Sequence, residues 1–240
     1  MHKGECAMPL SSPDQPPSPA KKPSLFSRLF GLLKNPEPFY YHASKILVRA
    51  LYRVRYEGFE HIPQTGPAII ISNHVSYMDG LVINTGLNRR IRYVIYEKIY
   101  RQPGVHYFMK LNRAIPIDSN REAVAVALEK IKEALENGEC ICLFPEGKLT
   151  LTGNMNRFRF GIEWILEKYP ATVYPVALKG LWGSIMSKKY SGSRFGMFPR
   201  SFRRRVVAKC GEPIPADSAR ISHLQKIIME LKNSIDLAGS

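Results

Sequence analysis

Short apolar runs alternate with amphipathic stretches along most of the chain. The runs are rich in Ile, Val, Leu and Cys and are four to seven residues long, which is typical of buried strands. They cover residues 68–72, 91–96, 114–117, 140–144, 172–178 and 205–210. This alternation predicts an α/β fold: a three-layer αβα domain with a mostly parallel, mixed sheet, preceded by an amphipathic N-terminal helical segment.

Helical periodicity is clearest over residues 120–136, where Gly138 follows the last periodic position. Apolar residues at helical spacing also predict helices over 157–168 and over about 217–236. The last of these begins at Asp217 or Ser218 and is expected on the outside of the domain.

The first quarter of the chain departs from this pattern. Residues 1–23 are rich in Pro and Ser, cannot support a core, and are predicted to be a disordered tail. Residues 24–56 are predicted to form amphipathic helices, one beginning at Ser24 and one over 39–56. These helices could pack on the core or lie in a membrane interface. Large aromatics with basic residues, and no acid between Glu37 and Glu57, favour the membrane. Residues 57–240 would then be the catalytic domain.

Composition narrows the class of partner. With 240 residues and 45% hydrophobic content, the chain can bury one substantial core. A formal charge of +15 requires an anionic partner, either nucleic acid or an anionic membrane. Between Glu167 and Glu212 there are only basic charges, interleaved with aromatics, which suits an anionic bilayer, an acidic protein or a single nucleic-acid strand. Without a recognised nucleic-acid motif, the membrane is favoured.

The cysteines indicate a reduced, intracellular protein. Cys140 and Cys142 occupy alternate positions of one apolar run, so both should face the same side of a strand. No Cys/His group has the spacing of a zinc site, and the start of the chain lacks the apolar region of a signal peptide. No apolar run reaches eighteen residues, so no membrane-spanning helix is predicted.

His74 and Asp79 follow the apolar run that ends at Ser72. Five residues apart, they would point about 140° away from each other on a regular helix, so they can meet only if the chain turns between them. In that turn Asp79 would accept a hydrogen bond from one imidazole nitrogen, and the other nitrogen would take a proton from an alcohol. The alternative is structural: His74 fills a polar gap and Asp79 is an N-cap.

A second block, LFPEGKLT, occupies residues 143–150. Pro145 should stop strand pairing, Glu146 should emerge at the same sheet edge as His74, and Gly147 permits close backbone approach by a ligand. Glu146 and Gly147 could position a polar group of a substrate beside His74. The two blocks together point to acyl transfer.

These blocks resemble those of the glycerolipid and lysophospholipid acyltransferases, Asn-His-x-x-x-x-Asp at 73–79 and Phe-Pro-Glu-Gly at 144–147. AIPIDS at 114–119 is similar to the second block of that family and VYPVAL at 173–178 to its fourth, so the resemblance covers about residues 45–215. Within the family, GLWGS at 180–184 looks like the acyltransferase domain of the bifunctional acyl-carrier-protein synthetase and 2-acylglycerophosphoethanolamine acyltransferase.

The resemblance implies direct transfer from a thioester. His74 would deprotonate a lysophospholipid hydroxyl, which attacks the carbonyl of acyl-CoA or acyl-carrier protein, while Asp79 orients His74. The acceptor would be held by Asn73, Pro145, Glu146 and Gly147. No metal or cofactor is implied, because the acyl thioester is a co-substrate. With the basic charge and the amphipathic segment, this predicts peripheral or monotopic attachment to the cytoplasmic face of an anionic membrane.

One departure from the family concerns the acceptor. Phosphatidate-forming members commonly carry Arg where this chain has Ser119; Arg113 or Arg121 could take over the phosphate contact. We therefore expect a diester lysolipid such as lysophosphatidylethanolamine to be used better than lysophosphatidate. The first alternative is a phosphatidate-forming 1-acylglycerol-3-phosphate acyltransferase. The alternative from another class is a basic membrane- or nucleic-acid-binding protein without catalysis, against which the intact His74 and Asp79 argue.

Overall fold

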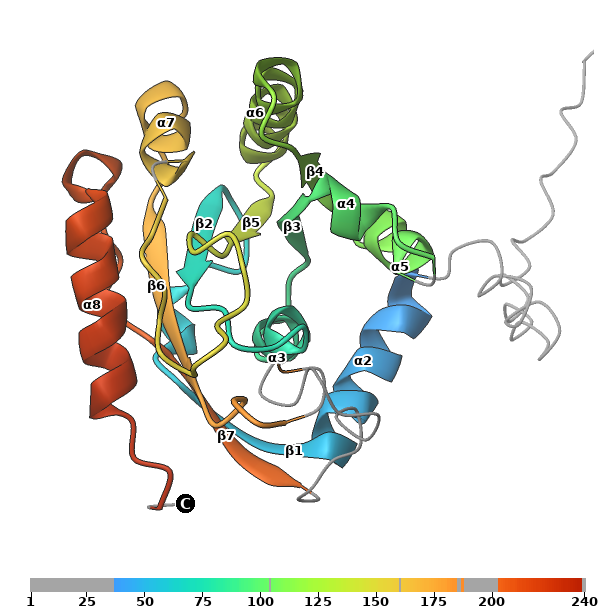
Figure 1. Ribbon diagram of the computed structural model, residues 1–240, viewed down its shortest axis with the longest axis vertical. Helices are drawn as coiled ribbons and strands as arrows, with labels where there is room; N and C mark the ends of the chain where they lie inside the picture. The colour runs from blue at the N-terminus through green and yellow to red at the C-terminus, as the bar shows by residue number, and fades with distance from the viewer. Residues whose placement is uncertain (1–36, 104, 160, 185–186, 188–202, 239–240) are drawn as a thin grey trace, which may run out of the picture. The chain divides into compact units, whose positions relative to one another are not determined.

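The computed structural model describes residues 37–103, 105–159, 161–184, 187 and 203–238 (Figure 1). The predicted tail 1–23, the predicted helix from Ser24 and most of the basic stretch after Lys179 lie outside these residues. Residues from Pro36 onward form one compact unit.

The unit is built on one seven-stranded sheet, in the order β1-β7-β6-β2-β5-β3-β4. Every neighbouring pair is parallel except β6 with β7. The strands are β1 (Tyr52–Glu57), β2 (Ala68–Ser72), β3 (Ile91–Tyr96), β4 (Ile115–Ile117), β5 (Cys140–Leu143), β6 (Val173–Lys179) and β7 (Arg204–Cys210).

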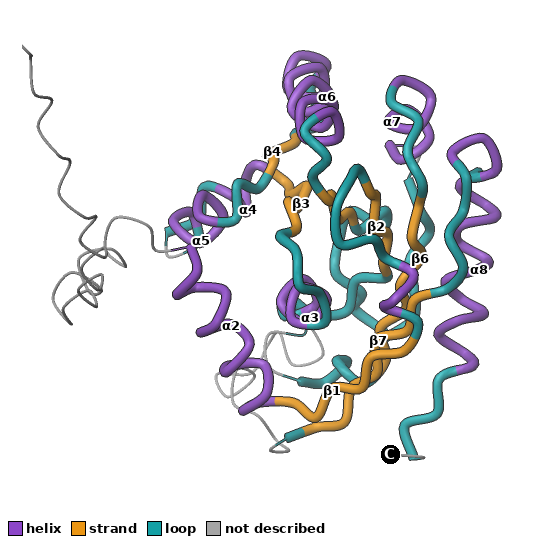
Figure 2. Tube along the Cα trace, turned by 180° about the vertical axis from the view of Figure 1, so that it is seen from behind, coloured by secondary structure: helices purple, strands orange, loops and turns teal. Residues whose placement is uncertain are grey.

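Helices cover both faces of this sheet (Figures 1 and 2). One face carries α6 (Arg121–Glu136), α7 (Gly161–Lys168) and α8 (Ile221–Ser234), and the other carries α2 (Glu37–Leu51) and α3 (Asp79–Thr85). Two short helices, α4 (Glu97–Tyr100) and α5 (His106–Leu111), connect β3 to β4. The predicted three-layer α/β fold with a mostly parallel sheet is confirmed.

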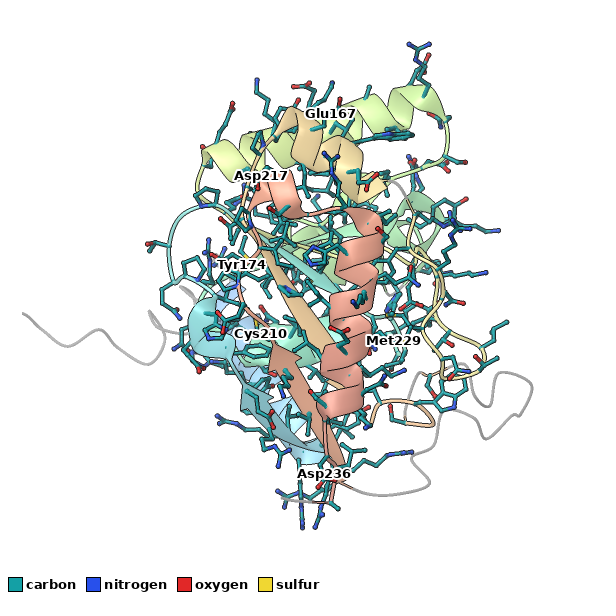
Figure 3. The ribbon with its side chains drawn as sticks, turned by 90° about the vertical axis from the view of Figure 1, so that its left-hand side faces the viewer. Glu167, Tyr174, Cys210, Asp217, Met229 and Asp236 are labelled. Carbon is teal, nitrogen blue, oxygen red and sulfur yellow. The ribbon has the colours of Figure 1, made fainter. Side chains whose placement is uncertain are left out.

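Side chains alternate between the two faces along each central strand. In β2, Ile69 and Ile71 belong to the apolar cluster under α6, α7 and α8, whereas Ile70 belongs to the cluster under α2 and α3. Cys140 and Cys142 both face the second cluster, as their spacing predicts. Figure 3 shows α8 along the sheet, with Met229 on its exposed side and Tyr174 and Cys210 on the strands beyond.

The helix predicted over residues 39–56 is correct only as far as Leu51. From Tyr52 the chain is strand β1, which pairs in parallel with β7, so residues 52–56 belong to the sheet and not to a membrane-associating helix. The sequence YRVRYE alternates apolar and basic residues with the period of a strand, a signal that the preceding helical pattern conceals. The buried Ser44 and Val48 show that α2 also packs one side against the core.

Two other helix starts were predicted too early. In the described residues α7 begins at Gly161, and Arg159 instead donates its backbone N–H to the Pro145 carbonyl, at 2.9 Å. The C-terminal helix α8 begins at Ile221 after a separate 3-10 turn at Ala216–Ser218. The first backbone N–H of α8 is satisfied by Glu163 Oε1, at 2.8 Å, a tertiary contact that no local pattern could predict.

Candidate active site

The carboxyl ends of β2, β5, β4 and β6 lie at the same edge of the sheet because these strands run parallel. His74 leaves the sheet just after β2, and the 144–147 turn just after β5. Both predicted blocks therefore meet at this edge, which we call the carboxyl edge.

The chain turns sharply between β2 and α3, as the spacing of His74 and Asp79 requires. His74 Nδ1 lies 2.8 Å from Asp79 Oδ2. The same carboxylate oxygen accepts the backbone N–H groups of Val75 at 2.6 Å and Ser76 at 2.9 Å. These donors precede Asp79 in the chain, whereas an N-cap accepts from residues that follow it, and Met78 is the N-cap of α3. Asp79 thus closes the turn and orients the imidazole.

The imidazole of His74 is held on two sides. Its ring stacks on Phe144 with a centroid separation of 4.2 Å and an interplanar angle of 17°. Since Nδ1 is engaged by Asp79, Nε2 is the nitrogen that can take a proton from a substrate, and the side chain keeps 18% exposure. This arrangement suits a general base.

Asp79 is completely buried, and burial raises the pKa of its carboxyl. The hydrogen bonds from His74, Ser76 and Val75 act in the opposite direction and favour the ionised form. An ionised carboxylate at this position fixes the tautomer of His74 and stabilises the imidazolium that forms during proton transfer. Asp79 Oδ1 is buried without a hydrogen-bond partner among the described residues.

Glu146 lies beside His74 at the carboxyl edge. Its Oε1 accepts the backbone N–H of His74 at 2.7 Å, and its Oε2 accepts both the backbone N–H and the side-chain amide of Asn156, at 2.7 and 2.8 Å. Only 1% of Glu146 is exposed. Burial raises the pKa of its carboxyl, while the bonds from Asn156 and His74 lower it. Both oxygens are thus engaged by the protein, and Glu146 holds the backbone of His74 in place, while the acceptor contact that the resemblance implies stays a prediction.

Gly147 is exposed, and the side chain of Arg159 lies next to it. Gly147 has φ +65°, and a Cβ there would lie 3.0 Å from Arg159 Nε and 3.1 Å from its Cδ. A side chain at residue 147 is therefore excluded by backbone strain and by Arg159. Gly147 was predicted to permit close approach by a ligand. In the structure its close neighbour is Arg159 of the same chain.

Two residues predicted to bind substrate are placed elsewhere. Asn73 is fully buried, and its amide exchanges two hydrogen bonds with the backbone of Leu178, at 2.8 and 3.0 Å, so it joins β2 to β6. Arg113 precedes β4 and pairs with Glu139, which precedes β5. It therefore lies at the amino edge of the sheet, the opposite edge from His74. Arg121, the exposed first residue of α6, does follow β4 to the carboxyl edge.

Several residues of the site were not found from the sequence. Asn156 holds Glu146 from a loop without periodicity, and Thr150 donates its backbone N–H to the carbonyl of His74, at 3.0 Å. Phe144 was read only as the end of a strand. Phe144 directly follows β5, and β5 pairs with β2. This position could have indicated that the Phe144 ring reaches His74.

A cavity of about 440 Å³ lies at the amino edge, away from His74. It is lined mainly by residues just before or at the start of strands, among them Gln64, Gly66, Arg89, Arg92, Arg113 and Glu139. In the described part of the chain, no three His, Cys, Asp or Glu side chains gather as metal ligands. No helix in the same residues is long and apolar enough to cross a bilayer.

Comparison with known proteins agrees with this geometry. The chain is 27% identical over 145 residues to the chloroplastic 1-acyl-sn-glycerol-3-phosphate acyltransferase LPAT1 of Arabidopsis thaliana, covering 60% of this chain and 40% of the relative. It is 26% identical over 153 residues to the 1-acyl-sn-glycerol-3-phosphate acyltransferase of Pseudomonas aeruginosa, covering 61% and 59%. The chain thus spans only about half the length of these relatives.

The crystal structure of the 1-acyl-sn-glycerophosphate acyltransferase PlsC from Thermotoga maritima shares the fold. It superposes with a TM-score of 0.59 at 24% identity, covering 89% of this chain and 82% of that one. The family model described as Acyltransferase matches residues 53–179, more than half of the chain, which includes His74, Asp79 and the 144–147 turn. This protein belongs to the Acyltransferase family.

Proposed function

We propose that this protein moves a fatty acyl group from a thioester to the free hydroxyl of a lysophospholipid. The observation that carries the proposal is the contact between His74 Nδ1 and the buried Asp79 at 2.8 Å. With Nδ1 engaged by Asp79, Nε2 is the nitrogen available for proton transfer. His74 Nε2 takes the proton of the hydroxyl as its oxygen attacks the thioester carbonyl. The carbon–oxygen ester bond forms, the carbon–sulfur bond breaks, and the thiol leaves with a proton.

For the acceptor, we propose 1-acylglycerol 3-phosphate as the first candidate. Relatives in plants and bacteria carry that substrate in their names, which supports the phosphatidate-forming alternative over lysophosphatidylethanolamine. The resemblance to the bifunctional synthetase and acyltransferase stays a prediction, as does the choice between acyl-CoA and acyl-carrier protein.

The test is an acyl-transfer assay that crosses lysophosphatidate, lysophosphatidylethanolamine and lysophosphatidylcholine with acyl-CoA and acyl-carrier protein. Products are identified by mass spectrometry. We expect phosphatidate to form fastest. Faster formation of phosphatidylethanolamine would restore the diester acceptor, and no product from any pair would contradict the proposed transfer.

We also propose that α2 contacts an anionic membrane peripherally. Its outer side exposes 70% of Ile46 and much of Leu47 next to the exposed Arg49, a mixture suited to a bilayer interface. Val126 on α6 is a matched control, since it is an exposed aliphatic residue on another element. Ile46→Glu should weaken cosedimentation with vesicles containing phosphatidylglycerol several-fold, while Val126→Glu should not. Equal effects of both changes would place the contact elsewhere. The cytoplasmic face of attachment stays a prediction.

A further inference from the structure

The turn formed by residues 144–147 brings two functional side chains close together. It is closed by a hydrogen bond from Gly147 N–H to the Phe144 carbonyl, at 2.9 Å. In a closed turn the first and last Cα atoms are less than about 7 Å apart. His74 stacks on Phe144, the first residue of this turn, and the Arg159 side chain lies against Gly147, its last residue.

The backbone around Arg159 is fixed from both sides. Its N–H donates to the Pro145 carbonyl at 2.9 Å, and the preceding N–H, of Phe158, donates to Gln225 Oε1 on α8, at 3.0 Å. The Phe158 ring is buried in the cluster beneath α6, α7 and α8. Phe158 is buried, whereas the adjacent Arg159 is exposed. The arginine is thereby held at the carboxyl edge by the fold.

The charge of Arg159 is not balanced by a carboxylate among the described residues. The nearest acid in the turn, Glu146, is buried, with both oxygens bonded to His74 and Asn156. Lys148, also exposed, adds positive charge next to Gly147. An exposed guanidinium in such surroundings matches an oxygen pair of a phosphate, to which it can donate two parallel hydrogen bonds.

We propose that Arg159 binds the phosphate of the acceptor and so determines that the acceptor is a phosphate-bearing lysolipid. This inference rests on the proposed function and names the part of the substrate that its site recognises. With the hydroxyl at His74 Nε2, the phosphate lies further along the glycerol backbone, over Gly147. Arg159 thus takes the role that Ser119 cannot fill and that Arg113, at the opposite edge, cannot reach.

Arg159→Gln tests this role, since it keeps the backbone bond to Pro145 and removes the charge. Arg157→Gln is the matched control, with the same loss of charge two residues away on the same segment. With lysophosphatidate, we expect Arg159→Gln to raise KM about 10- to 100-fold with kcat changed less than about threefold. Arg157→Gln should change KM less than about twofold, and Arg159→Lys should fall between the two glutamine variants because an ammonium lacks the planar fork.

A monoacylglycerol acceptor, which has no phosphate, separates recognition from structure. Its kcat/KM should be the same in wild type and Arg159→Gln. An equal loss with both acceptors would show that Arg159 only supports the turn, and the inference would be wrong.

Binding without turnover keeps the inference distinct from the proposed function. Equilibrium dialysis with labelled glycerol 3-phosphate should show about tenfold weaker binding to Arg159→Gln than to wild type or Arg157→Gln. If wild type transfers no acyl group, the proposed function fails, but this difference would still support a phosphate site at Arg159. Equal binding by all three proteins would overturn the inference whatever the transfer assay shows.

Discussion

Both edges of the sheet carry polar side chains, but they use them differently. At the amino edge, Arg89 donates to the carbonyls of Pro63, Gly66 and Gly138, and Arg92 and Arg113 share Glu139. These groups join loops to one another. At the carboxyl edge, the contacts of Asp79 and Glu146 converge on one residue, His74, and leave one of its nitrogens for a substrate.

The difference shows that neither a cavity nor a cluster of charge locates this active site. The cavity of about 440 Å³ lies at the amino edge with Arg89, Arg92 and Arg113, yet every donor there that the contacts describe serves the backbone or Glu139. The carboxyl edge is distinguished by the imidazole of His74, which the buried carboxylate of Asp79 holds at the ends of parallel strands. The four predictions below test that contrast, from the largest expected effect to the smallest.

Asp79→Asn should lower kcat about 10²- to 10⁴-fold, because an amide cannot stabilise the imidazolium as a carboxylate does. The acceptor KM should change little, since Asp79 touches His74 and not the substrate. Steady-state transfer to lysophosphatidate checks both values. Retention of more than a tenth of the wild-type kcat would mean that Asp79 only closes the turn.

Glu146→Gln should lower kcat about 10- to 100-fold with little change in acceptor KM. Glutamine has only one side-chain oxygen, so its NH₂ group must face either the His74 N–H or Asn156. Two donors then face each other, and this displaces His74 from its position. The separate effects on kcat and on acceptor KM distinguish positioning of His74 from direct contact with the acceptor. A raised KM with an unchanged kcat would support the acceptor contact that the family resemblance implies.

Arg113→Ala should leave kcat/KM for lysophosphatidate within about twofold of wild type. The change removes an ion pair that is half exposed on the arginine side, so the free energy of unfolding should fall by no more than about 1 kcal/mol. Thermal melting and the transfer assay are measured on the same preparation. A large loss of kcat/KM would return Arg113 to the phosphate and contradict the contrast between the edges.

The smallest effect concerns the dependence of stability on pH. Burial raises the pKa of Glu146 in the folded protein above its ordinary value of 4.5. Below that value the group is protonated in both the folded and the unfolded state; as pH rises, the folded state retains the proton longer, so the free energy of unfolding decreases. Relative to Glu146→Gln, wild type should therefore lose stability as pH rises from about 4.5 through the raised pKa. Urea unfolding of both proteins across this range provides the measurement. A difference that grows in favour of wild type would show that the hydrogen bonds outweigh burial.

Period and spacing in the sequence were sufficient for strands β2 to β7, because each of them has its own apolar run. Strand β1 was missed because its alternation follows a helix without a break at Leu51. The meeting of His74 with Asp79 could be predicted because the chain must turn where the strand ending at Ser72 gives way to a helix. The meeting of His74 with residues 144–147 could be predicted because parallel strands end at one edge.

The contacts of Glu146 and Arg159 could not be predicted in the same way. Asn156 reaches Glu146, and Arg159 reaches Gly147, from a loop that follows no periodic pattern. Arg113 is next to the 114–119 block in the sequence. Strand β4 is so short, however, that residues just before it and just after it lie at opposite edges of the sheet. Such placements depend on how loops fold back on the sheet. The local pattern of apolar and polar residues does not determine this.

The most direct test of the central claim is acyl transfer by His74→Ala beside wild type, with a labelled acyl thioester and lysophosphatidate and with folding confirmed by circular dichroism. We expect kcat to fall by at least about 10²-fold while the melting curve stays cooperative, because the Nε2 base is lost and the sheet is not. A folded His74→Ala protein that retains more than a tenth of the wild-type rate would contradict the assignment of His74 as the base.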